Sequence, residues 1–337
     1  MQKDLNKILI ESMLKTAMKD IHCSPGRTVR NLIDLAVNFS KGRFQKNFMR
    51  VIQNMLQNTD SAYYQLCTDS ISNVDMDYLI RFGMNLGYNG CTKGAALIRK
   101  IEEEKGFNIP WSLTLQINLE KLQSDPISYP DILRQGLALG ICTYFLFLPS
   151  GDAEKLIPLF EGQPDCAFLL FLRGHQITET LMKHAEKSKN VLIFVFHNEE
   201  MPEACIKLRE AKLPYAVYHR YTKDDVERIV NGQWVTEILP YHPQVALLFA
   251  DESCTVETCE EVYQCILSAR ESQKYPVLFV DGVVDVWKID NIISDDAYVV
   301  GFSGDGNMRT YDGRRKEENY NIFQNSLEDV LRNTIKK

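Results

Sequence analysis

The apolar positions of this chain follow a helical period over its first third and a strand-like pattern afterwards. From residue 4 to residue 105, apolar side chains recur at intervals of three and four, which is typical of amphipathic helices. Asp60 and Asp75 are of the types that cap helix N-termini, and Gly106 is of the type that ends a helix. We therefore predict an all-helical N-terminal region over residues 1–108.

Short runs rich in β-branched and aromatic residues follow this region. Most are continuously apolar, as strands buried on both faces of a parallel sheet are. Helical patterns separate them, so that a strand recurs at about every 25th residue. The predicted strands are residues 111–117, 143–148, 167–172, 190–196, 214–219, 245–250 and 275–280.

This alternation indicates an α/β fold. We count about six or seven strand-and-helix units, which are too few to close an eight-stranded barrel. The prediction is therefore a partial (β/α)6-type TIM-like barrel over residues 109–282. After it, residues 296–314 predict two strands joined through the stretch Ser303-Gly304-Asp305-Gly306, and residues 325–337 predict a closing helix. We assign residues 283–337 to a small extension of β-hairpin and helix.

Composition is that of a globular protein, with 45% hydrophobic and 25% charged residues. No apolar run approaches the roughly 20 residues that a membrane helix needs, and the N-terminal segment lacks the pattern of a signal peptide. We therefore expect a cytoplasmic protein. The nine cysteines are an odd number without paired spacing, which favours reduced thiols buried as small apolar side chains.

The net charge of −7 is unevenly distributed. Residues 1–59 hold ten Lys and Arg against four Asp and Glu, so the rest of the chain is strongly acidic. A basic segment can bind an anionic partner, or it can be a solvated helical surface docked on the chain's own acidic part. The candidate contacts for an anionic partner are Arg27, Arg30, Lys41, Arg43, Lys46 and Arg50.

Polar residues follow the predicted strands, where parallel β/α folds place their chemistry. These candidate ligand-binding residues are Ser150, Gly151, Asp152, Gly174, His175, His197, Glu199, His219 and Asp251. Three histidines and several carboxylates at one rim could serve as an acid–base pair or bind a divalent metal. No HxH, HExxH or CxxC spacing supports a metal, so we predict no metal site and name no catalytic residue.

Three stretches carry a family resemblance: "NLGYNGCTKGAALIRKIEEEKGFNIPW", "YPDILRQGLALGICTYFLFLPSGDAEKLIPLFEGQPDCAFLLFLRGHQI" and "GFSGDGNMRTYDGRRKEENYNIFQNSLEDVL". In this order, from about residue 85 to the end, the chain resembles radical S-adenosylmethionine (radical SAM) proteins that have a helical preface and a C-terminal extension of the SPASM or twitch kind. The resemblance implies a partial barrel whose first strand leads into the functional loop.

The functional positions of that family are altered here. Its active members carry CxxxCxxC after the first strand, and those thiolates hold a [4Fe–4S] cluster that binds S-adenosylmethionine. The equivalent segment, "NLEKLQSDPISYP", has no cysteine. The glycine-rich turns after the second and third strands keep only Gly151 and Gly174, and neither Tyr298 nor Tyr311 is the cysteine that an auxiliary cluster would use.

The resemblance therefore implies a pseudoenzyme without an iron–sulfur cluster or other cofactor. We expect a non-radical binding or regulatory partner of a small ligand, a peptide or an active radical SAM relative, and we do not expect nucleic acid as the partner. Two alternatives remain. One is a metal-dependent or acid–base enzyme that reuses the barrel rim, and the other is an adaptor that binds anionic partners through the basic N-terminal helices.

Overall fold

The computed structural model describes residues 5–18, 27–28, 30–31, 34, 53, 57–58, 60–294, 300–310 and 313–334. The chain divides into two compact units. The first unit holds residues 1–80 and 195–284, and the second holds residues 81–194 and 285–337. The predicted domain boundaries after residues 108 and 282 stay predictions.

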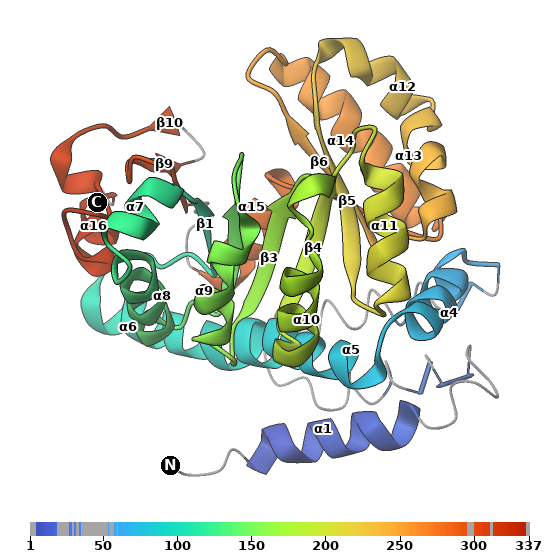
Figure 1. The fold of residues 1–337 in the computed structure, drawn as a ribbon, viewed down its shortest axis with the longest axis horizontal. Coiled ribbons are helices and arrows are strands. Elements are labelled where there is room, and N and C mark those ends of the chain that lie inside the picture. The colour runs from blue at the N-terminus through green and yellow to red at the C-terminus, as the bar shows by residue number, and fades with distance from the viewer. Residues whose placement is uncertain are drawn as a thin grey trace. The chain divides into compact units, whose positions relative to one another are not determined.

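The second unit is built on a largely parallel sheet (Figure 1). Its strand order is β10-β9-β8-β1-β2-β3-β4, and β4 continues into the first unit at residue 195. β1 pairs in parallel with both β2 and β8, while β9 pairs antiparallel with β8 and β10. The strands are β1 (Ser112–Gln116), β2 (Thr143–Phe147), β3 (Ala167–Leu172), β4 (Val191–Phe196), β8 (Val300–Phe302), β9 (Met308–Thr310) and β10 (Gly313–Arg314).

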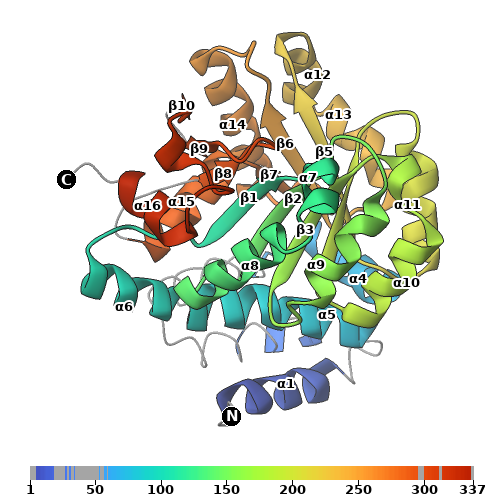
Figure 2. The same cartoon turned by 60° about the vertical axis from the view of Figure 1, so that its left-hand side comes forward.

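Helices connect these strands, and α8 and α9 lie beside each other along the sheet (Figure 2). The helices of the second unit are α6 (Ala95–Lys105), α7 (Leu119–Ser124), α8 (Ser128–Leu139), α9 (Ile157–Glu161), α10 (Glu179–Ser188), α15 (Val284–Ile293) and α16 (Leu327–Thr334). Short 3-10 turns are η2 (Ala153–Leu156), η3 (Gly174–Gln176) and η6 (Glu318–Tyr320).

The first unit contains three parallel strands in the order β5-β6-β7. They are β5 (Tyr215–Tyr221), β6 (Val245–Ala250) and β7 (Leu278–Asp281). Its helices are α1 (Leu5–Met18), α4 (Tyr63–Asn73), α11 (Met201–Glu210), α12 (Val226–Val230), α13 (Gln233–Ile238) and α14 (Val256–Glu271), with 3-10 turns η4 (Lys223–Asp225) and η5 (Leu239–Tyr241).

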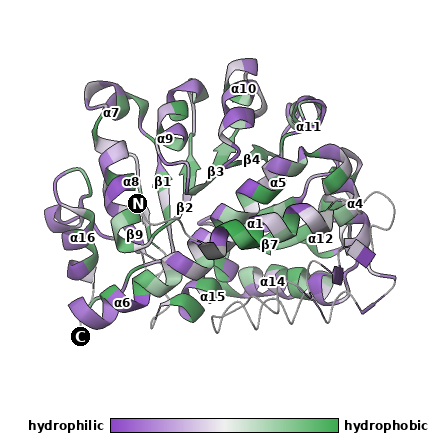
Figure 3. Ribbon diagram, turned by 90° about the horizontal axis from the view of Figure 1, so that it is seen from below, coloured by the Kyte–Doolittle hydropathy of each residue, from purple (hydrophilic) through white to green (hydrophobic). Residues whose placement is uncertain are grey.

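The core follows from the apolar runs of the sequence. All six residues of β3 are buried, because both faces of this strand are covered. The helices instead carry hydrophilic and hydrophobic residues on different sides, as the mixed colours of α9 and α10 show (Figure 3). Within the described part of the chain, no helix has both the length and the apolar character needed to cross a membrane.

The predicted helical N-terminal region is helical in its described parts. Asp75 caps α5 (Met76–Gly83) by accepting a hydrogen bond from the Tyr78 N–H, and Gly106 ends α6 with φ of 70°. Asp60 was predicted wrongly as a cap. The hydroxyl of Ser61 accepts the N–H of Tyr63 at the start of α4 instead, because it stands one position nearer to the helix.

Between α5 and α6 the chain forms a π-helix, η1 (Met84–Gly94), with buried asparagines. The Asn85 amide donates to the carbonyls of Pro164 and Cys166 at 2.9 and 3.0 Å. The Asn89 amide donates to the side chain of Asn85 and to the carbonyl of Asp165 at 3.0 and 2.8 Å. These bonds satisfy the backbone of the turn that leads into β3, so they fix η1 against the sheet of the second unit.

The predicted α/β class is confirmed, and each of the seven predicted strands corresponds to one of β1 to β7. Two elements differ from the prediction. The segment after β1 was read as a loop but contains α7, and the alternation continues past Gly282 through α15 to β8. Because β8 pairs in parallel with β1, it occupies the place that an eighth strand takes beside the first in a (β/α) barrel. The (β/α)6 description of the barrel stays a prediction.

Candidate functional site

The segment after β1 is held in place by its neighbours. Asn118 caps α7, because its side-chain oxygen accepts the backbone N–H of Lys121 at 3.1 Å. The Asn118 amide donates to the carbonyl of Gly304 at 3.1 Å, and its backbone N–H donates to the hydroxyl of Tyr129 at 2.9 Å. The position at which the family would place its cluster ligands is thus a helix tied to α8 and to the turn after β8.

Leu119 fills the space between α7 and the turn after β2. Gly151 in that turn has φ of +94°, a conformation that favours glycine. A Cβ at this position would lie 2.5 Å from Cδ1 of Leu119, well inside contact distance. The glycine that this chain shares with the family's turn therefore accommodates a leucine from its own helix.

The residues present do not fit a [4Fe–4S] cluster after β1. Such a cluster is held by cysteine thiolates, and residues 117–130 contain no cysteine. Cys142 and Cys166 directly precede β2 and β3, so they lie at the opposite strand ends from α7. A hydrogen bond with Cys142, together with burial, raises the pKa of the Cys166 thiol far above its ordinary value, and burial raises that of Cys91 to about 12. These thiols stay protonated.

The cysteines near α14 do not form a ligand set either. The thiol of Cys254 donates to the carbonyl of Tyr221 at 3.5 Å, whereas the thiol of Cys265 donates to the carbonyl of Ile229 at 3.7 Å. More generally, the described residues include no group of three His, Cys, Asp or Glu side chains that could hold a metal ion.

Five predicted site residues lie in the second unit, in the turns after β2 and β3: Ser150, Gly151, Asp152, Gly174 and His175. The buried Gln176 ties the two turns together. Its side-chain amide donates to the carbonyl of Gly151 at 3.1 Å, and its side-chain oxygen accepts the N–H of Arg173 at 2.8 Å. Asp152 caps η2 through the N–H of Glu154 at 2.9 Å, and both Ser150 and His175 are exposed.

The other four predicted site residues lie in the first unit. The structure brings His197 and His219 together, with ring centroids 5.4 Å apart and an edge-to-face geometry. Asp251 instead forms an ion pair with Arg220, whose Nε lies 3.0 Å from its carboxylate, and Glu199 is exposed. The predicted carboxylates therefore do not join the histidine pair.

Trp234 on α13 packs against both histidines. It is only 1% exposed and stacks on His219 with centroids 6.1 Å apart and on Phe279 of β7 at 5.8 Å. His197 meets the same indole edge to face at 5.9 Å. Both ring nitrogens of His219 and the Nε1 of Trp234 are buried without a hydrogen-bond partner in the described part of the chain. We call His197, His219 and Trp234 the histidine–tryptophan cluster.

Burial makes this cluster neutral. Desolvation, with the neighbouring His219, lowers the pKa of His197 to about 4, and desolvation also lowers the pKa of His219. The charged groups that face it partly oppose one another: Arg228 lowers the pKa of His197, while Glu237 and Asp225 raise it. Asp225 is the carboxylate nearest to His219, with 3.6 Å between its Oδ1 and the ring Nε2.

We expect stability to fall in acid because of this cluster. Well above pH 6.5 both histidines are neutral in the folded and unfolded chains, so they contribute no pH dependence there. As the pH falls through 6.5 toward about 4, the unfolded chain takes up protons that the folded cluster resists, so the free energy of unfolding progressively decreases. Urea unfolding measures this effect when it is repeated at several pH values from pH 8 down to pH 4.

The His197→Gln variant supplies the control for this pH series. It should reduce the proton uptake on unfolding near pH 5 by up to about one proton, and by less where solvent screens the partly exposed ring. An unchanged pH dependence in the variant would contradict the assignment of a depressed pKa to His197.

The cluster does not favour the acid–base alternative, since the nitrogens of His219 have almost no contact with solvent. Sequence reasoning missed Trp234, Asp225 and Gln176. Asp225 had a recognisable signal, because it lies three residues after Thr222, the spacing of a capping box. In the structure, both the backbone N–H and the hydroxyl of Thr222 donate to its carboxylate. Trp234 carried only the general signal that a large apolar side chain is usually buried.

The basic N-terminal segment is described only in part. The guanidinium of Arg30 lies over the ring of Tyr64 on α4, 5.9 Å from its centroid. At least this arginine therefore contacts the chain's own surface. Four of the predicted contacts for an anionic partner lie outside the described residues: Lys41, Arg43, Lys46 and Arg50.

Comparison with solved structures supports the fold relation that the resemblance implies. The crystal structure of Streptococcus suis SuiB bound to precursor peptide SuiA matches with a TM-score of 0.50 and 9% identity, over 70% of this chain and 67% of that chain. SuiB bound to S-adenosylmethionine matches with a TM-score of 0.50 and 10% identity, over 70% of this chain and 66% of that one.

A third crystal structure of Streptococcus suis SuiB matches with a TM-score of 0.50 and 10% identity, over 89% of this chain and 78% of that chain. No protein-family model matches the sequence, and no curated protein matches it either. At such low identity the likeness to SuiB concerns the fold alone, and it supports a relation to the radical SAM fold.

Proposed function

We propose that this chain is a peptide-binding protein that uses a radical-SAM-like scaffold without radical chemistry. One observation carries the proposal. The segment after β1 forms a capped helix whose Leu119 packs against Gly151, where a cluster-bearing relative would need a cysteine-lined loop. Because the chain's own side chains fill that position, we infer that the scaffold binds a ligand and does not carry out radical chemistry.

The peptide as ligand is supported by the fold relation. SuiB, which shares the fold at a TM-score of 0.50, has been crystallised with a precursor peptide. In the proposal this chain binds such a peptide as a non-radical partner in the cytoplasm, and the C-terminal residues 283–337 serve as a degenerate SPASM-like extension. The predicted rim residues of each unit remain candidates for ligand contacts.

A selection of random displayed peptides tests the proposal with the purified full-length chain as the target. The expected result is enrichment of peptides that, once synthesised, bind the chain saturably and bind an unrelated α/β protein of similar charge much more weakly. If no peptide is enriched above the unrelated protein, the proposed function is wrong.

A further inference from the structure

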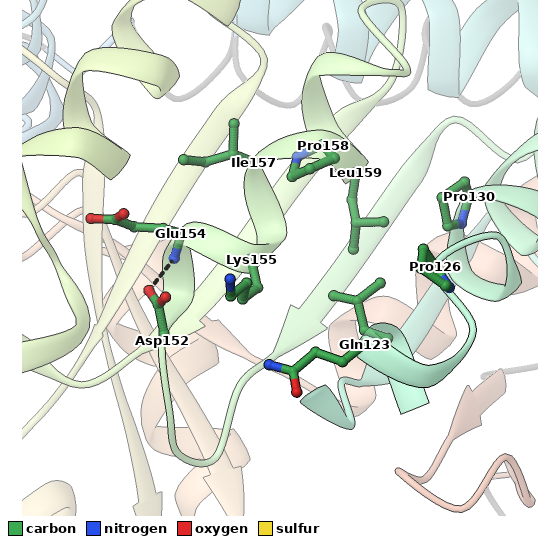
Figure 4. A pocket seen from close by; sticks show the side chains of 10 residues that line it. Gln123, Pro126, Pro130, Asp152, Glu154, Lys155, Ile157, Pro158 and Leu159 are labelled. Carbon is green, nitrogen blue, oxygen red and sulfur yellow. Dashed lines mark hydrogen bonds between the residues drawn. The ribbon is translucent and has the colours of Figure 1, made fainter. Parts of the chain in front are cut away.

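A groove of about 470 Å³ lies in the second unit beside the predicted site residue Asp152 (Figure 4). It separates two segments that follow β1 and β2. One wall comes from α7 and the start of α8, and the other from η2 and α9. The lining residues are Leu122, Gln123, Pro126 and Pro130 on the first wall, and Asp152, Glu154, Lys155, Ile157, Pro158 and Leu159 on the second.

Both walls of the groove carry apolar side chains. Pro126 and Pro158 are exposed at its two sides, and a proline ring loses almost no side-chain entropy when a ligand covers it. The apolar surface continues at Ile127, next to Pro126, which is 74% exposed. Covering such a surface is favourable in proportion to the apolar area removed from water. The walls therefore suit a large apolar side chain, and best a flat aromatic one.

The polar end of the groove has unused hydrogen-bonding groups. Among the described residues, the side chains of Gln123 and Lys155 make no hydrogen bond or ion pair with the rest of the chain. Figure 4 shows the Gln123 amide extending from its wall toward the opposite one. An amide can donate to a backbone carbonyl and accept a backbone N–H, and an ammonium donates only. Together these two groups can bind an extended peptide backbone.

The charges of the groove favour a basic ligand. Asp152 uses one carboxylate oxygen to cap η2, and its side chain is exposed. Glu154 accepts the hydroxyl of Thr178 at 2.7 Å, and Figure 4 shows its carboxylate pointing away from the opposite wall. The Asp152 carboxylate is therefore the negative group at this end of the groove, and Lys155 is the cationic residue of the same wall. A cationic residue beside the buried apolar one would be attracted to the Asp152 end, and an acidic residue would be repelled there.

From these contacts we infer that the groove binds an extended peptide segment in which an aromatic residue is followed or preceded by Lys or Arg. This inference rests on the proposed peptide-binding function and names the class of peptide. The aromatic side chain lies between the proline-lined walls, the backbone meets Gln123 and Lys155, and the cation meets Asp152.

Three short synthetic peptides with a fluorescent label test the inference by anisotropy. Each has a Gly/Ser background, and the central pair is Phe-Arg, Phe-Glu or Ser-Arg. The full-length chain should bind the Phe-Arg peptide about tenfold more tightly than either of the others, since each loses one of the two interactions. Equal binding of the Phe-Arg and Phe-Glu peptides would overturn the inference.

The Asp152→Asn variant separates charge from folding, because the asparagine oxygen can still cap η2. It should weaken Phe-Arg binding about fivefold and leave Phe-Glu binding no weaker. The matched control is Glu186→Gln, which removes one charge from an exposed position of α10. A second variant, Pro126→Trp, fills the groove and should abolish binding of both Phe peptides.

The outcomes distinguish this inference from the proposed function. If peptides selected against the chain bind equally well to the wild type, Asp152→Asn and Pro126→Trp, the groove is not their site, while peptide binding itself stands. If neither the selected nor the designed peptides bind, both the inference and the proposed function are wrong. If Pro126→Trp fails to fold, the binding of the Phe-Arg and Phe-Glu peptides to Asp152→Asn decides whether the groove is the binding site.

Discussion

Replacing Gly94 with alanine is expected to lower the free energy of unfolding by about 3 kcal/mol. Gly94 ends the π-helix η1, and a Cβ there would lie 2.4 Å from the carbonyl oxygen of Gly140 and 2.8 Å from that of Asn89. Both obstacles are backbone atoms, which cannot move away as a flexible side chain can. Gly140 cannot move away either. It ends α8 with φ of +97°, and a Cβ added to it would lie 2.7 Å from the carbonyl oxygen of Gly94.

Gly87→Ala is the matched control, since Gly87 lies in the same π-helix and a Cβ there would have no atom within 4 Å. This change should leave stability unaltered or raise it by up to about 1 kcal/mol through helix propensity. Urea unfolding followed by circular dichroism measures both variants. If Gly94→Ala proved as stable as Gly87→Ala, the close backbone approach of η1 to the end of α8 would be wrong.

Replacing Trp234 with alanine should cost about 3 to 5 kcal/mol, as expected for a fully buried tryptophan. The indole stacks on both His219 and Phe279, so its loss leaves a cavity at the centre of the histidine–tryptophan cluster. Water entering that cavity would solvate the imidazoles. We therefore expect the pKa of His197 to move from about 4 toward its ordinary value of 6.5.

Trp234→Phe separates the two effects of this change. Phenylalanine keeps an aromatic face against His219 but removes the buried Nε1, which has no hydrogen-bond partner in the described part of the chain. It should lose much less stability than alanine and leave the pKa of His197 depressed. Chemical denaturation and NMR titration of the imidazole protons measure these effects, and a His197 pKa that is the same in all three proteins would contradict the role of burial by Trp234.

The regular strands could be predicted because their residues are buried on both faces. Such burial leaves a continuous apolar run, as in β3 and β4, and the run is visible without knowing the neighbours. The short strand β8 falls within the hairpin predicted over residues 296–314 and pairs antiparallel with β9, but its parallel pairing with β1 could not be found in this way. The partner strand β1 lies about two hundred positions earlier in the chain, and a three-residue run carries too little pattern to identify such a partner.

The helix α7 was missed for a similar reason. Its six residues are too few for a helical period, and none of them is buried. Its stability comes from the Asn118 cap and from contacts with Gly304 and Gly151, which are distant in sequence. The cap residue itself was visible in the sequence, but a cap without an apolar stripe does not distinguish a short helix from a turn.

The candidate site residues were chosen because polar groups gather at strand ends, and that rule finds positions rather than partners. Asp152 lies beside the groove of the second unit and His197 beside His219 in the first, but the rule predicted neither contact. It could not foresee that Asp251 would pair with Arg220 or that Gln176 would tie two turns together. Those contacts depend on side-chain geometry, which the pattern of residue types does not contain.

The proposed function requires that this scaffold acts without an iron–sulfur cluster. Anaerobic reconstitution of the full-length chain with iron and sulfide, followed by desalting and measurement of bound iron and visible absorbance, tests it most directly. Because α7 and Leu119 fill the position after β1 and no thiolate is present there, we predict iron far below one cluster per chain and no brown chromophore. A stoichiometric [4Fe–4S] chromophore that survives desalting would contradict the account.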